Sequence, residues 1–544
     1  MKKILPFLLF CLIVNSSFAR RIDAGTHFSD KKNIYYTLDH SDYLREWSIS
    51  PEVNPDILRI YCDKPIIVTF FLKSEEFEFT VNQNDTINFA IILKGKDTAY
   101  TQVIGVKEIP NTIKTEDKLY HLSRLWSEAK YNFVNIDQLR FDWDSLYYAY
   151  IPQIMKSEND YAYSKLLKKF YASLNDGHTE VGKPSSLSVY CDYIPITISA
   201  FDKQLYITGF SKNSSIDSSF LGAKIIEIEQ IPTLQYIDEE VLPYISASTE
   251  QSKWMQVPAV LGYDLRIKKF NALVLKKSGE KVSISISRNG EATRTKEEGE
   301  SLVPPKNISW DLVQLEWLQD SILHLSINGF YPEEIVIPQL KQMEPQILKA
   351  KRLIIDLRGN GGGTTGVAWV LQSYLTKGNF LINYAWQTRI NDGVRRANGN
   401  WIEEYQDFYM DRAYRTEKGD TIPISDTIIR WTMPTVILIG EYTFSAAEDF
   451  LVNIYEVPDR PLLIGSESGG STGSPLVIEN LPLDSRARVC TRRILYPYSL
   501  KPFVNKGVTP DIIVETSFED FCSGKDIVLQ KGIETVSKIS KLAN

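Results

Sequence analysis

A glycine-rich run lies between two apolar segments of different character. "DLRGNGGGTTG", residues 356–366, follows the strand-like run at 353–355 and precedes residues 367–371, which have helical character. Consecutive glycines let backbone N–H groups approach a ligand closely at a helix N-terminus. Such groups stabilise either a phosphate or the oxyanion of an acyl-transfer reaction. The run therefore predicts an anion-stabilising loop of one of these two kinds.

The phosphate interpretation is the weaker of the two. Gly361, Gly363 and Gly366 match the G-x-G-x-x-G spacing of dinucleotide-binding folds, but such folds also need an acidic residue at the end of the next strand. The next strand-like run, residues 380–384, is followed by Ala-Trp-Gln. No Gly-Lys-Ser/Thr follows the glycines either, which excludes a P-loop. We therefore favour an oxyanion role and expect no nucleotide cofactor.

A second junction offers a nucleophile. The apolar run 436–439 ends at Gly440, and residues 441–450 read "EYTFSAAEDF". Ser445 would open a helix, and the small residues that follow it leave its hydroxyl accessible. A serine at a helix start is most often only an N-cap, and the pattern is not the G-x-S-x-G elbow of α/β-hydrolases. The two junctions together predict acyl transfer by a serine.

Four motifs carry a family resemblance. "LIIDLRGNGGG", "IGEYTFSAAEDF" and "KGVTPDIIV" follow one another in the order seen in C-terminal processing (tail-specific) serine peptidases, and "LNDGHTEV" at 174–181 is similar to the tricorn-core branch of that family. The resemblance covers residues 105–520. It implies a crotonase-like α/β catalytic core, a helical region before it and a PDZ-like domain between them. Asp356 and Arg358 match framework positions of the family.

The resemblance assigns roles to four residues. Ser445 matches the nucleophile and His178 matches the general base of the tricorn-type site. The backbone N–H groups of Gly362 and Ala446 match the oxyanion hole. These roles correspond to serine-peptidase chemistry without a metal or a cofactor.

Two positions depart from the tricorn pattern. Gly177 stands where that pattern has a serine before the histidine, and Val504 stands where it has a glutamate. Val504 cannot orient an imidazole, so another group must do so. Asp176, Glu180 and Glu467 are candidates, and the sequence does not choose among them.

A lysine base is excluded by the sequence. Many members of the family pair the serine with a lysine, and Ser471 occupies that position here, 471 − 445 = 26 residues after the nucleophile. No lysine lies between Ser445 and Lys501. His178 is therefore the predicted base, and activity is expected to fall as the pH drops through the ordinary histidine range near a pKa of ~6.5.

The N-terminus is typical of a secretory signal peptide. Lys2 and Lys3 precede an apolar run at 4–14, and Ser17-Phe18-Ala19 supplies small residues for cleavage after residue 19. We therefore expect an exported protein, periplasmic or extracellular. No later stretch approaches the ~18 apolar residues of a membrane-spanning helix.

The composition of the chain argues against a nucleic-acid partner and a metal site. The chain has 544 residues, a formal net charge of −7 and no Lys/Arg-rich stretch, so a nucleic-acid partner is not expected. The five histidines include no H-E-x-x-H, and the four cysteines after the signal peptide include no C-x-x-C, so no metal site is indicated. One or two disulfides among Cys62, Cys191, Cys490 and Cys522 stay open, as does the oligomeric state.

Hydrophobic periodicity divides the chain into regions. Short alternating runs predict β structure, three- and four-residue steps predict helices, and strands that alternate with helices predict an α/β core. "LGAKIIEIEQIP" resembles part of a PDZ-like domain. The predicted regions are a signal peptide at 1–19, a small N-terminal β domain at 20–105, a helical part carrying His178 at 106–185, a PDZ-like β-rich domain at 186–290, an α/β peptidase core at 305–525 and a C-terminal helix at 526–544.

Two functions fit these features. The first is an exported serine endopeptidase that cuts peptides or protein C-terminal tails. The second is a catalytically inactive protein that binds peptides in its PDZ-like groove, and the valine at the glutamate position favours it. Covalent labelling of Ser445 by a serine-directed reagent would distinguish the two. Cleavage preference and natural substrate cannot be derived from the residues.

Overall fold

The computed structural model describes most of the chain. The described residues are 28–30, 33–38, 56–61, 66–72, 75–81, 83–93, 98–211, 214–288, 300–302, 312–318, 321–390 and 392–539. The predicted signal peptide and Cys62 lie outside them. The chain forms two compact units, Met1–Thr112 with Ser186–Tyr190, and Ile113–Ser185 with Cys191–Asn544.

The described residues of the first unit up to Val106 lie mainly in β-strands, and the N-terminal β domain at 20–105 stays a prediction. Its five-stranded sheet has the order β1-β2-β6-β7-β3. The strands are β1 (Phe28–Asp30), β2 (Asn33–Leu38), β3 (Asp56–Tyr61), β6 (Thr86–Leu93) and β7 (Thr98–Val106). A hairpin of β4 (Ile66–Leu72) and β5 (Glu75–Val81) is separate from this sheet.

Three helices open the second unit: α2 (Thr115–Asn132), α3 (Trp143–Met155) and α4 (Asp160–Ala172). Their aromatic stripe is core packing, since Trp143 stacks on Phe170 with ring centroids 4.4 Å apart. The same cluster includes residues of a small sheet of β8 (Glu180–Val181), β27 (Pro475–Leu481) and β28 (Ser485–Cys490). Because β8 begins two residues after His178, pairing with β28 fixes the loop that carries this histidine.

An antiparallel sheet follows, in the order β10-β11-β12-β15-β16. The strands along this order are β10 (Ile196–Phe201), β11 (Gln204–Phe210), β12 (Lys224–Ile228), β15 (Phe270–Leu275) and β16 (Lys281–Ile286), and two short strands, β13 (Ile231–Pro232) and β17 (Glu300–Ser301), pair with β12 and β11. Helices α5 (Thr233–Glu240) and α6 (Glu250–Gly262) pack on it through Ile237, Trp254 and Val257. The β-rich character agrees with the sequence, and the PDZ-like assignment stays a prediction.

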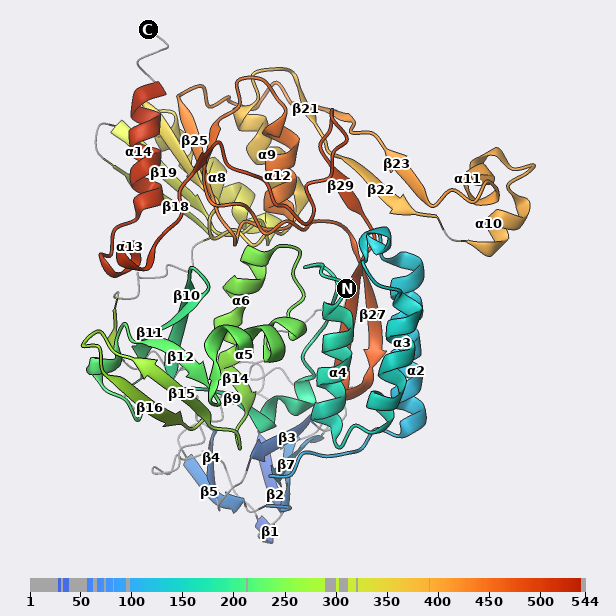
Figure 1. The fold of residues 1–544 in the computed structure, drawn as a ribbon, viewed down its shortest axis with the longest axis vertical. Coiled ribbons are helices and arrows are strands. Elements are labelled where there is room, and N and C mark those ends of the chain that lie inside the picture. The colour runs from blue at the N-terminus through green and yellow to red at the C-terminus, as the bar shows by residue number, and fades with distance from the viewer. Residues whose placement is uncertain are drawn as a thin grey trace. The chain divides into compact units, whose positions relative to one another are not determined.

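The last part is a mixed α/β layer structure (Figure 1). Its sheet has the order β18-β19-β20-β25-β26-β30, with β18 antiparallel and the other five strands parallel. The strands are β18 (Val313–Trp317), β19 (Ile322–Ile327), β20 (Arg352–Asp356), β25 (Thr435–Ile439), β26 (Leu462–Gly465) and β30 (Ile512–Ile513).

Helices cover both faces of this sheet. Side chains alternate between faces along a strand, so Leu353 and Ile355 belong to one apolar cluster and Ile354 to another. The first cluster includes α8 (Glu333–Ile347), α9 (Thr365–Leu375) and α12 (Ala446–Tyr455). The second is closed by α14 (Ile527–Ile539), which lies on the other side of the sheet in Figure 1. The crotonase-like assignment of this core stays a prediction.

Three loops leave the same edge of the sheet. Parallel neighbours β20, β25 and β26 end at residues 356, 439 and 465, so the loops at 357–364, 440–445 and 466–474 begin side by side. The carboxyl ends of parallel strands are the usual place for a site in such sheets. The glycine run and Ser445, which are far apart in sequence, are thereby brought together.

A long insertion separates β20 and β25 in the sequence. It includes the paired strands β22 (Ala385–Arg389) and β23 (Tyr414–Glu417) and the short helices α10 (Gly393–Asn398) and α11 (Gln406–Tyr409). The insertion projects from the core in Figure 1.

The described residues also bear on the predictions about disulfides, membrane-spanning helices and metal sites. Cys191, Cys490 and Cys522 are free thiols. Within the described part of the chain, every helix is too short or too polar to cross a membrane. The same residues contain no group of three or more His, Cys, Asp or Glu side chains arranged to hold a metal ion.

Candidate active site

Ser445 has an unusual backbone conformation. It lies in the loop after β25 and immediately precedes α12, and its backbone has φ 57° and ψ −125°. A non-glycine residue at this φ is strained and persists only where its surroundings hold it. Thr443 Oγ1 donates to the carbonyl of Leu357 at 2.9 Å, and Phe444 N donates to the carbonyl of Asn360 at 3.0 Å. The turn that presents the serine is thus fastened to the glycine-rich loop.

The imidazole of His178 faces this serine. His178 Nε2 lies 3.1 Å from Ser445 Oγ, although the two residues are 267 positions apart. That separation is within hydrogen-bond reach for proton transfer. The ring stacks on Phe444 with centroids 4.7 Å apart and planes 6° apart. The structure therefore brings together the two residues that the sequence predicts as nucleophile and base.

Burial determines the charge state of the histidine. His178 is 4% exposed, and burial, with a smaller contribution from Arg488, lowers its pKa to about 3. An imidazole with this pKa is neutral at pH 7 and has one nitrogen free to accept a proton. Its protonated form would be strongly disfavoured before any substrate binds.

The other ring nitrogen contacts a serine that the sequence did not assign to the site. His178 Nδ1 lies 2.8 Å from Ser471 Oγ, and Ser471 Oγ lies 3.5 Å from Asp176 Oδ2. The sequence identified Ser471 only as a residue at a lysine position. Its place in the loop after a third parallel strand is the signal that could have found it. Asp176 is the one orienting candidate on this side of the ring.

The other two orienting candidates have different partners. Glu180 forms an ion pair with Arg488. Glu467 accepts hydrogen bonds from Gln251 Nε2 at 3.3 Å and from Thr509 Oγ1 at 3.2 Å. Their carboxylates are thus engaged elsewhere.

The two departures from the tricorn pattern have structural counterparts. A Cβ at Gly177 would lie 3.0 Å from two ring carbons of Phe444, so a serine there would crowd the ring that stacks on His178. Val504 is buried in the apolar cluster of the α/β core. A valine is compatible with that environment, whereas an unpaired carboxylate would be costly.

A buried carboxylate holds the loops together. Glu448, in the first turn of α12, accepts hydrogen bonds from Ser468 Oγ at 2.6 Å, Gly470 N at 2.7 Å, Ser471 N at 3.0 Å and Ser445 N at 3.2 Å. Burial raises the pKa of this carboxyl, while all four partners are donors and favour the carboxylate form. Glu448 thus connects the backbone of Ser445 to that of Ser471.

The glycine-rich loop packs closely against Ser445 at Gly362. Gly362 has φ +92°, and a Cβ there would lie 2.7 Å from Ser445 Cβ and 2.8 Å from Ala446 N. Only glycine fits this approach. The N–H of Gly362 donates to Asn360 Oδ1 at 2.9 Å, so an oxyanion would replace or share that acceptor. Ala446 N lies at the N-terminus of α12, where the helix dipole favours negative charge.

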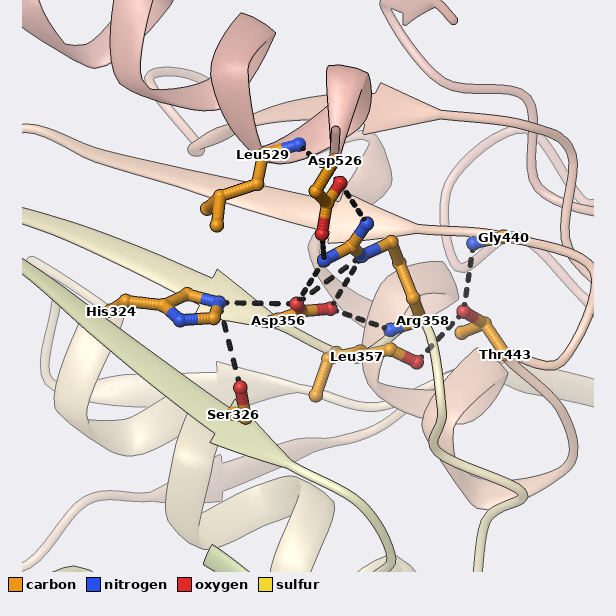
Figure 2. A network of polar contacts seen from close by, with 9 residues as sticks. All are labelled: His324, Ser326, Asp356, Leu357, Arg358, Gly440, Thr443, Asp526 and Leu529. Atoms are coloured by element: carbon orange, nitrogen blue, oxygen red, sulfur yellow. Dashed lines mark hydrogen bonds and ion pairs between the residues drawn. The ribbon is translucent and has the colours of Figure 1, made fainter. Parts of the chain in front are cut away.

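A second group of residues resembles a triad but lacks its geometry (Figure 2). Ser326 Oγ and Asp356 Oδ2 both approach the same nitrogen, Nε2 of His324, at 3.5 and 3.1 Å. A catalytic triad needs its carboxylate and its serine on opposite nitrogens of the ring. This arrangement cannot relay a proton from the serine.

That network is a framework instead. Arg358 donates to Asp356 Oδ2 and to Asp526 Oδ2, both at 2.7 Å, and Asp526 Oδ1 accepts from Leu529 N in the first turn of α14 (Figure 2). Burial opposes ionisation of Asp356, but hydrogen bonds from His324 and Arg358 outweigh it and hold the pKa of this carboxyl well below its usual range. The network ties the end of β20 to the C-terminal helix.

Comparison with known proteins gives a family match for the part of the chain that contains Ser445. Residues 321–514 match the model of peptidase family S41. Members of this family are serine peptidases that act on proteins or peptides. The resemblance found in the sequence motifs is confirmed. No curated protein matches the chain.

Two solved structures of mature CPAF share the fold. Mature CPAF complexed with lactacystin is 14% identical, with 79% of this chain and 98% of that chain covered and a TM-score of 0.59. A second crystal structure of mature CPAF is 14% identical, with 79% of this chain and 97% of that chain covered and a TM-score of 0.59. The photosystem II D1 C-terminal processing protease is 14% identical, with 76% and 98% coverage and a TM-score of 0.40.

Proposed function

We propose that this protein is an exported serine endopeptidase that cuts peptides or protein C-terminal tails, with Ser445 as nucleophile and His178 as general base. The observation that carries the proposal is the 3.1 Å separation between Ser445 Oγ and His178 Nε2. A neutral, buried imidazole next to a strained serine is the arrangement that activates a hydroxyl.

The reaction follows from the positions of these atoms. Ser445 Oγ attacks the scissile carbonyl carbon while its proton passes to His178 Nε2. The resulting oxyanion accepts hydrogen bonds from the N–H groups of Ala446 and Gly362, the latter turning from Asn360 Oδ1 to the substrate. His178 then returns its proton to the leaving amine, and water releases the acyl group by the same steps in reverse.

Assignment of His178 as base agrees with the tricorn-core branch. A lysine is ruled out at the equivalent position because Ser471 stands there, with its hydroxyl on the opposite nitrogen of the histidine. Export and action on chain ends rest on the signal-peptide pattern and on the family resemblance. The inactive peptide-binding alternative was favoured by Val504, and the match to a peptidase family does not favour it.

A serine-directed fluorophosphonate tests the proposal. Mature protein, residues 20–544, is incubated with the reagent and digested, and the adduct is located by mass spectrometry. We expect a single adduct on Ser445, and we expect Ser445→Ala to abolish both the adduct and the hydrolysis of an unfolded protein substrate. Ser466→Ala is the matched control, because the Ser466 hydroxyl bonds Glu441 at 2.8 Å and not His178. Turnover that survives in Ser445→Ala would overturn the assignment.

A further inference from the structure

The direction of the hydrogen bonds around His178 decides whether the site works. A general base must receive the Ser445 proton on Nε2, so the ring hydrogen must sit on Nδ1. Nδ1–H then donates to Ser471 Oγ, 2.8 Å away. In the opposite arrangement Ser471 donates to Nδ1, and Nε2–H points at Ser445. That tautomer cannot take a proton from the serine.

Asp176 selects between these two arrangements. It is 1% exposed, and its Oδ1 accepts from His178 N and Thr179 Oγ1, each at 2.9 Å. Its Oδ2 faces Ser471 Oγ at 3.5 Å. A carboxylate only accepts hydrogen bonds, so the Ser471 hydroxyl hydrogen is drawn toward Asp176. The oxygen of Ser471 is then left to accept from the ring.

We infer that Ser471 and Asp176 are positioning residues that hold His178 in the tautomer with hydrogen on Nδ1. Together they supply the orienting function of the glutamate that is replaced by Val504. This inference rests on the proposed function, since it assigns the groups that prepare the proposed base. Neither residue touches the reacting atoms.

Stacking on Phe444 cannot do this task alone. Stacking on Phe444 fixes the plane of the His178 imidazole. A half-turn of the ring about its Cβ–Cγ bond keeps that plane, but it places a carbon where each nitrogen was, so that carbons face Ser471 and Ser445. A polar partner at Nδ1 distinguishes the two orientations without relying on the reacting serine at Nε2. Ser471 is that partner in this structure.

The position of Ser471 is itself fixed. Its N–H bonds Glu448 Oε2 at 3.0 Å, and its carbonyl accepts from Ser445 N at 3.3 Å. The nucleophile and the orienting hydroxyl are therefore held by the same carboxylate and by each other. Because the distance between Ser445 and Ser471 is fixed in this way, each nitrogen of the His178 ring stays within hydrogen-bond reach of its serine.

Asp176→Asn is the sharpest test. His178 N and Thr179 Oγ1 both donate to Asp176 Oδ1. An asparagine whose amide oxygen takes the place of Oδ1 keeps these two hydrogen bonds and turns its NH2 group toward Ser471. Ser471 then accepts from the amide and donates to Nδ1, which reverses the tautomer. We expect kcat to fall by on the order of 10² to 10⁴, the upper value being that of the corresponding change in chymotrypsin-like peptidases, with KM little changed.

A spectroscopic readout separates positioning from folding. The mature protein is labelled with 15N-histidine, and the His178 signals are assigned by their loss in His178→Gln. At pH 7 we expect the Nδ1–H tautomer in the wild type and the Nε2–H tautomer in Asp176→Asn. Ser471→Ala removes the acceptor, and we expect a mixture of tautomers with activity lower by on the order of 10- to 100-fold. Thermal unfolding verifies that each variant folds.

The outcomes are distinguishable. An unchanged His178 tautomer with full activity in both Asp176→Asn and Ser471→Ala, alongside inactive Ser445→Ala and His178→Gln, overturns this inference and leaves the proposed function intact. An active Ser445→Ala variant overturns the proposed function first. If Asp176→Asn does not fold, the tautomer and kcat of Ser471→Ala decide, with Ser466→Ala as the matched control.

Discussion

The ring of Phe444 lies parallel to the imidazole of His178, with centroids 4.7 Å apart and planes 6° apart. Phe444 precedes the proposed nucleophile, so the residue that adjoins Ser445 also supports its base. One rigid turn therefore positions both the serine and the histidine.

Replacing that ring should misplace the base. Phe444→Leu removes the stacking surface, and we expect kcat to fall on the order of 10- to 100-fold, because small displacements of reacting groups are costly. Phe450→Leu is the control, since Phe450 is a buried core residue of the same segment. Steady-state kinetics and thermal unfolding should show lost stability in both variants but lost kcat per folded molecule only in Phe444→Leu. Equal kcat values would show that stacking does not position His178.

Alanine substitutions at the neighbouring Gly361 and Gly362 should have very different effects on activity and stability. In Gly362→Ala the new Cβ would lie 2.7 Å from Phe444 O, at a φ of +92°. We expect kcat to fall by on the order of 10²-fold and the free energy of unfolding to fall by about 1–3 kcal/mol. Gly361→Ala is the matched control, because nothing lies within 4 Å of its Cβ and we expect a change within about 0.5 kcal/mol. Normal turnover in folded Gly362→Ala would remove this residue from the oxyanion hole.

The acid limb of activity should lie below the ordinary histidine range. The sequence suggests a fall near pH 6.5, but burial lowers the pKa of His178 to about 3. We therefore expect kcat/KM to stay high as the pH drops through 6, measured with an uncharged peptide substrate. Between pH 6.5 and 3 the unfolded chain binds this proton and the folded chain does not, so His178 lowers the free energy of unfolding as the pH falls. An acid limb near 6.5 in fully folded enzyme would contradict a buried neutral base.

Loss of the framework arginine should cost stability and not chemistry. Arg358→Leu leaves the buried Asp356 without its cationic partner, and we expect the free energy of unfolding to fall by about 3–5 kcal/mol at pH 7. The depressed pKa of Asp356 stabilises the fold above its ordinary pKa of 3.8 and is lost on acidification, so the deficit should shrink below that pH. Denaturant titrations measure it. Lys377→Ala breaks an exposed pair with Asp459 and should cost less than about 1 kcal/mol.

Periodicity predicted the α/β core well because its strands are continuous apolar runs. Residues 353–355 and 436–439 were expected as strands, and β20 and β25 lie there. Helix α6 was missed, because residues 250–262 have a weak apolar period and include Pro258. The insertion between β20 and β25 was also missed, since its short strands pair with each other and with residues far along the chain.

The site was predictable where the motifs are local. Ser445 and Gly362 each sit in a recognisable segment, and His178 follows from a family pattern. Ser471 could not be assigned, since its role depends on a contact with a histidine 293 positions away. The shifted pKa of His178 was equally hidden, because burial by distant elements sets it.

The pairing of β8 with β28 has a consequence for when the protein becomes active. His178 lies beside β8, whose partner strand ends at Cys490, later in the chain than Ser445 and Ser471. Contacts across such separations form late in folding, because long loops must close first. A chain that ends before β28 therefore lacks the strand that fixes the loop of His178. Pairing of β8 with β28 is thus a structural precondition for the activity that we propose.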